Sequence, residues 1–225
     1  RRVLDELNPR RMRGTLIAVP TVNVFGMLQQ QRYLPDRRDL NRSFPGGGGG
    51  SLARRLAHLF MTEIVAGCSF GIDLHTASDS RENLPQVRCN LDDLECRRLA
   101  VAFGAPVTVH SREREGSLRH AAMAAGVKVL VYEAGQAMRF DEPAIRAGVR
   151  GVLAALDAGG LWRDKRKGAE GPEAATIPLQ ARKTSWARTP RAGFARMRVE
   201  LGDHVVAGQS VCAVGGPFGG RSLSV

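Results

Sequence analysis

The stretch Gly71-Ile72-Asp73-Leu74-His75-Thr76-Ala77 is a short apolar run that ends on an acid, a leucine and a histidine. In a strand, Ile72 and Leu74 would point to one face while Asp73 and His75 point to the other. Open α/β sheets bind ligands at the carboxyl ends of their strands. We therefore expect His75 at a sheet edge, with Asp73 close enough to fix its tautomer, as a carboxylate does for a metal-bound histidine. On this stretch alone, a histidine bonded to a backbone carbonyl is the simpler explanation.

Helices and strands alternate around this stretch. The hydrophobic patterns predict helices over residues 52–65, 92–103, 117–125 and 142–158. They predict strands over residues 14–20, 70–75, 106–110 and 127–133. Residues 21–38 carry no clear element, and residues 77–91, with Asn83 and Pro85, are expected to form a polar loop. The alternation of helix and strand predicts an α/β protein with a three-layer α/β/α domain.

The composition changes after Trp162, which predicts a second part of the chain. Residues 163–175 are charged and contain glycine and proline, as linkers do. Short strands between glycine turns follow, expected over residues 176–186, 193–199, 205–206 and 211–214. We therefore predict an α/β domain over residues 1–162, where any catalytic groups would lie at the strand ends, a linker over residues 163–175, and a smaller all-β module over residues 176–225, which we expect to be truncated.

The chain carries a formal net charge of +11, which raises nucleic acid or an anionic surface as a partner. Its arginines are spread along the whole length, only two Trp and two Tyr are available for base stacking, and no nucleic-acid-binding motif occurs. We therefore assign the charge to recognition of an anionic small molecule, with no nucleic acid and no membrane as partner. Four cysteines without a Cys-x-x-Cys pair fit reduced thiols in the cytoplasm, and a homo-oligomer is left open.

Several strand and loop ends carry groups that suit a zinc hydrolase, namely a histidine, a carboxylate and an arginine. They lie in four segments: Arg32-Tyr33, Asp39-Leu40-Asn41-Arg42, Asp73-Leu74-His75-Thr76 and Tyr132-Glu133-Ala134-Gly135. In this order the segments resemble the successive motifs of the succinylglutamate desuccinylase/aspartoacylase family, relatives of the zinc carboxypeptidases. The pattern from Gly202 to Gln209 resembles the C-terminal β-domain of the same family.

This resemblance implies a zinc-carboxypeptidase-like fold that hydrolyses the amide bond of an N-acyl amino acid or a related small amide, with one Zn²⁺ per subunit. His75 matches a zinc ligand of the family, and Glu133 matches its general base. Arg42 matches the arginine that binds the substrate carboxylate, with Asn41 beside it. Arg32 matches the arginine that stabilises the tetrahedral oxyanion. The spacing leaves two neighbouring arginines as competitors for that last role, Arg37 and Arg38.

One family feature is missing, because the His-x-x-Glu pair that supplies the other two zinc ligands would lie upstream of Arg1. We therefore expect the sequence to be a fragment whose parent carries these ligands, and we expect the fragment alone to be inactive. The segment His110-Ser111-Arg112-Glu113 has the same spacing but lies in another part of the chain. It is kept as a less favoured replacement.

Three other functions compete with the deacylase. A metallocarboxypeptidase acting on peptides would share the fold, although the family's β-domain narrows access to the site. A catalytically inactive binding protein is expected if the two missing ligands do not exist. A basic nucleic-acid binder is the third. The sequence does not decide which acyl group or which amino acid the substrate carries.

Overall fold

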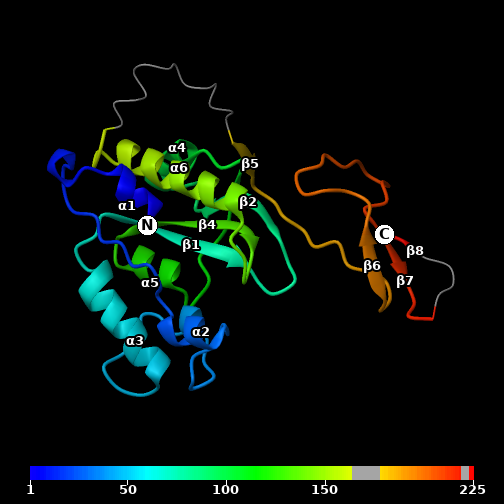
Figure 1. The fold of residues 1–225 in the computed structure, drawn as a ribbon, viewed down its shortest axis with the longest axis horizontal. Coiled ribbons are helices and arrows are strands. Elements are labelled where there is room, and N and C mark those ends of the chain that lie inside the picture. Colours follow the sequence, from blue (N-terminus) through cyan, green and yellow to red (C-terminus); the bar gives the residue numbers. More distant parts are fainter. Residues whose placement is uncertain (164–177, 219–222) are drawn as a thin grey trace. The chain divides into compact units, whose positions relative to one another are not determined.

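The computed structural model describes residues 1–163, 178–218 and 223–225, which form two compact units, Arg1–Arg182 and Lys183–Val225. The larger unit contains a five-stranded sheet (Figure 1). In spatial order its strands are β1 (Phe70–Ala77), β4 (Lys128–Gln136), β2 (Asn83–Cys89), β3 (Val107–His110) and β5 (Leu179–Ala181). Strands β2 and β4 are antiparallel and the other pairs are parallel, so the carboxyl ends of β1 and β4 lie beside the amino end of β2.

Short and long helices surround this sheet. The α-helices are α1 (Arg2–Glu6), α2 (Val24–Gln29), α3 (Leu52–Phe60), α4 (Leu94–Phe103), α5 (Leu118–Ala124) and α6 (Glu142–Ala158). Two 3₁₀ turns, η1 (Pro9–Arg11) and η2 (Leu40–Arg42), and a π-helical turn, η3 (Met61–Val65), complete the set. The four expected helices are confirmed, α6 with the predicted ends and the other three with shifted ends, and side chains of Ser51, Asp93, Ser117 and Asp141 cap their first turns.

Alternate residues of the strands pack into two different cores. Leu130 and Tyr132 of β4 belong to the core beneath α4 and α6, and Ile72 of β1 packs against it. Val129 belongs to a second core with residues of η3 and α5. Figure 1 shows α4 and α6 on one side of the sheet and α3 and α5 on the other. This arrangement confirms the predicted three-layer domain, and it places Asp73, His75 and Glu133 on the α5 side by strand parity.

Three expectations for the larger unit were wrong. Residues 14–20 are not a strand, and Ile17 and Val19 are 46% and 37% exposed, so this apolar run is not buried. Residues 24–29 form α2, which Asn23 caps by accepting a hydrogen bond from the Gly26 N–H. Residues 83–89 are β2 rather than a loop. Pro85 is tolerated in β2 because it lies where the register with β4 shifts, between Asn83 and Gln86.

The smaller unit is an antiparallel sheet of β6 (Phe194–Met197), β7 (Cys212–Gly215) and β8 (Leu223–Ser224). Two strands that the sequence predicted for this module are not part of its sheet. Residues 205–206 form no strand, and within the described part of the strand expected over residues 176–186, which begins at residue 178, only Leu179–Ala181 is formed. It is β5, which pairs with β3 in the larger unit. Residues 164–175 of the predicted linker lie outside the described residues. Among the described residues, no helix is long and apolar enough to cross a bilayer.

Candidate active site

The carboxyl ends of β1 and β4 bring His75 and Glu133 together, because the two residues are partners in the parallel register. His75 Nε2 lies 2.8 Å from Asp73 Oδ2, and both side chains are largely buried, at 25% and 17% exposure. A carboxylate only accepts hydrogen bonds, so Nε2 carries the proton of the neutral ring. The Nδ1 atom of His75 is therefore the ring nitrogen with a free lone pair.

The charge state of His75 is set by its neighbours. Burial disfavours the imidazolium, but the hydrogen bond with Asp73 and the negative charges of Asp73 and Glu133 outweigh burial and raise the pKa of His75. The positive charge of Arg32 acts in the opposite direction, so Arg32 lies within electrostatic reach of the ring. The charges of Asp73, Glu133 and Arg32 therefore all act on the protonation of His75.

A turn built on η2 carries the predicted substrate-binding residues. Asp39 caps this turn by accepting a hydrogen bond from the Asn41 N–H at 2.9 Å. The same carboxylate forms an ion pair with Arg32, whose Nη2 lies 2.9 Å from Asp39 Oδ2. Asn41 Oδ1 accepts a hydrogen bond from the Leu118 N–H at 2.8 Å, at the first residue of α5. The Asn41 oxygen thus joins the turn to α5, which leaves its Nδ2 as the group free to donate to a substrate.

Arg42 lies on this turn beside two other guanidinium groups. Burial lowers the pKa of Arg42 first, the charge of Arg114 lowers it further, and Arg32 adds to the effect. The negative charge of Asp39 opposes them. The guanidinium groups of Arg32 and Arg114 and the carboxylate of Asp39 therefore lie within electrostatic reach of Arg42. Such a cluster attracts an anionic group.

The loop that carries Arg114 is fixed against this turn. The Phe44 N–H donates to Gly116 O at 3.0 Å, and Arg119 donates from its guanidinium to Ser111 Oγ at 2.9 Å and to the Arg112 carbonyl. Arg119 is 8% exposed, so its guanidinium is a buried group that binds the loop rather than a surface charge. These bonds hold the loop over residues 111–117 against Phe44, two residues after η2, and against Arg119 of α5.

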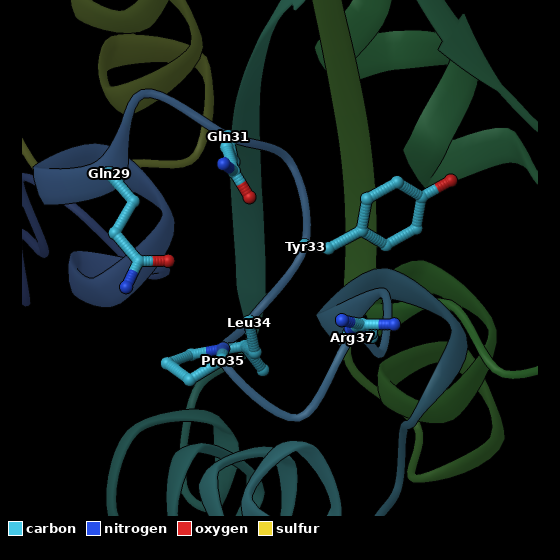
Figure 2. A pocket seen from close by; sticks show the side chains of 6 residues that line it. All are labelled: Gln29, Gln31, Tyr33, Leu34, Pro35 and Arg37. Atoms are coloured by element: carbon cyan, nitrogen blue, oxygen red, sulfur yellow. The ribbon is translucent and has the colours of Figure 1, made fainter.

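The two competitors of Arg32 lie elsewhere on the same stretch. Arg37 lines a shallow pocket, and Figure 2 shows this pocket around the chain that follows α2. The lining residues are Gln29, Gln31, Tyr33, Leu34, Pro35 and Arg37. Arg38 donates its backbone N–H to Asp36 Oδ1. Of these three arginines, Arg32 is the one whose charge acts on both His75 and Arg42.

The metal ligands expected from the sequence were His75 and, as a less favoured alternative, His110 with Glu113. No group of three or more His, Cys, Asp or Glu in the described part of the chain could hold a metal ion. His110, the alternative ligand, accepts a hydrogen bond from the Leu91 N–H through Nδ1 and has Asp92 3.9 Å from Nε2. His75, with its Nδ1 free and its Nε2 held by Asp73, has the chemistry of one ligand.

Sequence reasoning missed two residues of this site. Asn83 donates a hydrogen bond from Nδ2 to Glu133 Oε2 at 3.0 Å, and it had been assigned to a loop. The alternation of Gln86, Val87 and Arg88 is the signal that indicates a strand there, and Pro85 conceals it. Arg114 lies in a run of alternating charges, and nothing in that run distinguishes it from its neighbours.

The mixed sheet, with polar groups gathered at the carboxyl ends of β1 and β4, is that of an α/β protein with a small-molecule site at its sheet edge. The sequence matches the family model of the succinylglutamate desuccinylase/aspartoacylase catalytic domain over residues 1–158. The chain therefore belongs to this family, which confirms the resemblance of its motifs.

Individual relatives agree with this assignment. The chain is 28% identical over 219 residues to the N-alpha-acetyl-L-2,4-diaminobutyric acid deacetylase of Halomonas elongata; the match covers 93% of this chain and 63% of that protein. The chain thus spans less than two thirds of this curated relative. A succinylglutamate desuccinylase/aspartoacylase structure from Rhodobacter sphaeroides is similar in fold, with a TM-score of 0.85, 24% identity and coverage of 99% of this chain and 70% of that one. The product-bound ectoine utilization protein EutE (DoeB) from Ruegeria pomeroyi has a TM-score of 0.84, 20% identity and the same coverage.

Proposed function

We propose that this protein is a zinc-dependent deacylase that hydrolyses the amide bond of an N-acyl amino acid and releases a carboxylate and an amine. The observation that carries the proposal is the pairing of His75 with Glu133 at one sheet edge, with Arg32 within electrostatic reach of both His75 and Arg42. Family membership and the deacetylase relative support the same reaction class.

Zinc would be held by His75 through Nδ1, one ion per subunit, with the other two ligands outside these residues. When bound, the ion would polarise the scissile carbonyl and favour attack by water. Asp73 keeps the ring of His75 oriented and holds the proton on Nε2, so Nδ1 remains available.

The remaining steps fall to side chains of this chain. Arg42 would bind the substrate carboxylate, because a guanidinium can donate two parallel hydrogen bonds to a carboxylate. Arg32, held by Asp39, would face the oxygen that becomes negative as the carbonyl is attacked. Glu133 would take a proton from the attacking water and deliver it to the departing amine. The substrate is then a small amide with a carboxylate on its amino-acid part.

The test is release of free amine from N-acyl amino acids by the zinc-loaded full-length protein, beginning with N-acetyl substrates. Each substrate is compared with its methyl ester, which lacks the negative charge. Arg42→Ala should raise KM for the acid by about 10- to 100-fold, since a hydrogen bond to a charged group contributes about 1.5–3 kcal/mol. The ester should be affected far less. Arg55→Ala, an exposed arginine of α3, is the matched control and should behave as wild type.

Failure to release amine from any N-acyl amino acid would overturn the proposed reaction. Equal effects of Arg42→Ala on the acid and on its ester would overturn the role of Arg42 alone.

A further inference from the structure

The hydrogen bond from Asn83 to Glu133 joins residues that are 50 positions apart in the sequence. Asn83 is the first residue of β2, and its backbone pairs with Gly135 of β4 in the antiparallel register. The next register pair joins Gln86 to Glu133, so the ladder is irregular between Asn83 and Gln86. The register between β2 and β4 therefore shifts at the start of β2, so Asn83 does not have the partner that a regular antiparallel ladder would give it.

This irregularity lets the Asn83 side chain reach its partner. Residues two positions apart in a strand share a face, so Glu133 is the diagonal neighbour of Asn83. Gly135 lies directly opposite Asn83 in this register. It must remain glycine, because its φ is +62° and a Cβ there would lie 2.8 Å from Asp141 Oδ2.

The two carboxylate oxygens of Glu133 have different hydrogen-bonding environments. Asn83 Nδ2 donates to Oε2, and no described protein group is recorded donating to Oε1. A carboxylate that exchanges a proton with water and then with an amine needs one oxygen free and correctly aimed. Such alignment is what a neighbouring hydrogen bond provides in an active site.

We propose that Asn83 is a positioning residue of the general base, holding Glu133 Oε2 so that Oε1 is the atom that takes the proton and returns it. This inference rests on the function proposed above. It adds to that function a role for Asn83, the first residue of β2, in orienting the general base.

A purely structural role for Asn83 predicts different behaviour. If Asn83 only closed the start of β2, replacement by the isosteric Asp would be no worse than replacement by Ala. If Asn83 must donate to a carboxylate, Asn83→Asp is the more harmful change, since it puts an acceptor of like charge against Glu133. The comparison of Asp with Ala therefore separates the two roles.

The first experiment needs no metal and no substrate. The side-chain amide resonances of the ¹⁵N-labelled chain are recorded at neutral pH, with Asn83 assigned by its loss in Asn83→Ala. Glu133→Gln should move the Asn83 amide resonance, whereas Glu63→Gln, on η3, should leave it in place. An Asn83 resonance that is unchanged by Glu133→Gln would overturn the hydrogen bond and the inference with it.

The second experiment measures kcat and KM separately in the zinc-loaded full-length protein. Asn83→Ala should lower kcat by about 10-fold with little change in KM, in line with the usual effect of residues that orient a metal-site group. Asn83→Asp should lower kcat further. Asn90→Asp is the control, because Asn90 Oδ1 only accepts a hydrogen bond, from the Asp92 N–H. A KM effect alone, or Asp no worse than Ala, would overturn the inference.

The proposed function can fail independently of this inference. If Glu133→Gln is fully active, Glu133 is not the base and both proposals are wrong. If Glu133→Gln is inactive while both Asn83 variants are normal, the deacylase proposal stands and the role of Asn83 is refuted.

Discussion

Gly116→Ala is expected to disturb the arginine cluster without altering any of its side chains. Gly116 has a φ of +76°, and a Cβ added there would lie 2.8 Å from Arg42 O and 3.0 Å from Arg42 C. The left-handed conformation costs an alanine about 1–2 kcal/mol. Overlap with a backbone that cannot turn away adds about 1–3 kcal/mol. The total loss of unfolding free energy should therefore be about 2–5 kcal/mol.

The chain offers a matched control at the end of α5. Gly126 has a φ of +85° and no atom within 4 Å of an added Cβ, so Gly126→Ala carries the conformational cost alone. Urea denaturation followed by circular dichroism measures both variants. The excess loss in Gly116→Ala, about 1–3 kcal/mol, measures the contact with Arg42. In the full-length protein Gly116→Ala should also raise KM, while Gly126→Ala should not. Equal destabilisation and equal KM would refute the reasoning that this loop supports Arg42.

Two further predictions concern the run of five glycines over residues 46–50 and the buried thiols. Gly46→Ala should destabilise the protein by more than about 1 kcal/mol, because its Cβ would lie 2.2 Å from Arg54 O of α3 at a φ of +83°. Gly48→Ala, with open space around it, should be neutral in the same denaturation experiment. Burial raises the pKa of Cys89 to about 11 and that of Cys96 to about 12, so at pH 8 both should be thiols and react slowly with an alkylating reagent. Cys68, which is partly exposed, should be labelled first in mass spectra, and early labelling of Cys89 would contradict the packing.

The sequence predicts the parts of this fold that depend on local signals. Helices α5 and α6 begin where Ser117 and Asp141 offer capping oxygens, and β4 is a β-branched run long enough to be recognised. Strand parity alone placed Asp73 and His75 on one face. By contrast, the apolar run over residues 14–20 forms no described strand, because an apolar pattern does not guarantee a pairing partner.

The missed features depend on contacts between distant residues. The bond from Asn83 to Glu133 exists because β2 runs antiparallel to β4 and shifts its register beside Gly135. The nearness of Arg114 to Arg42 depends on a loop that the backbone hydrogen bond from Phe44 to Gly116 and the buried Arg119 hold in place. Neither arrangement leaves a pattern of spacing that a single sequence can reveal.

The central claim, that Glu133 is the base of a zinc-dependent deacylase, is tested most directly by one paired measurement on the full-length protein. Bound zinc per chain and the rate of amine release from an N-acyl amino acid are determined for wild type and for Glu133→Gln. The account predicts about one zinc in both proteins and a rate at least about 100-fold lower in Glu133→Gln, the usual contribution of a general acid/base group. A Glu133→Gln variant that keeps its zinc and hydrolyses the amide at the wild-type rate would contradict it.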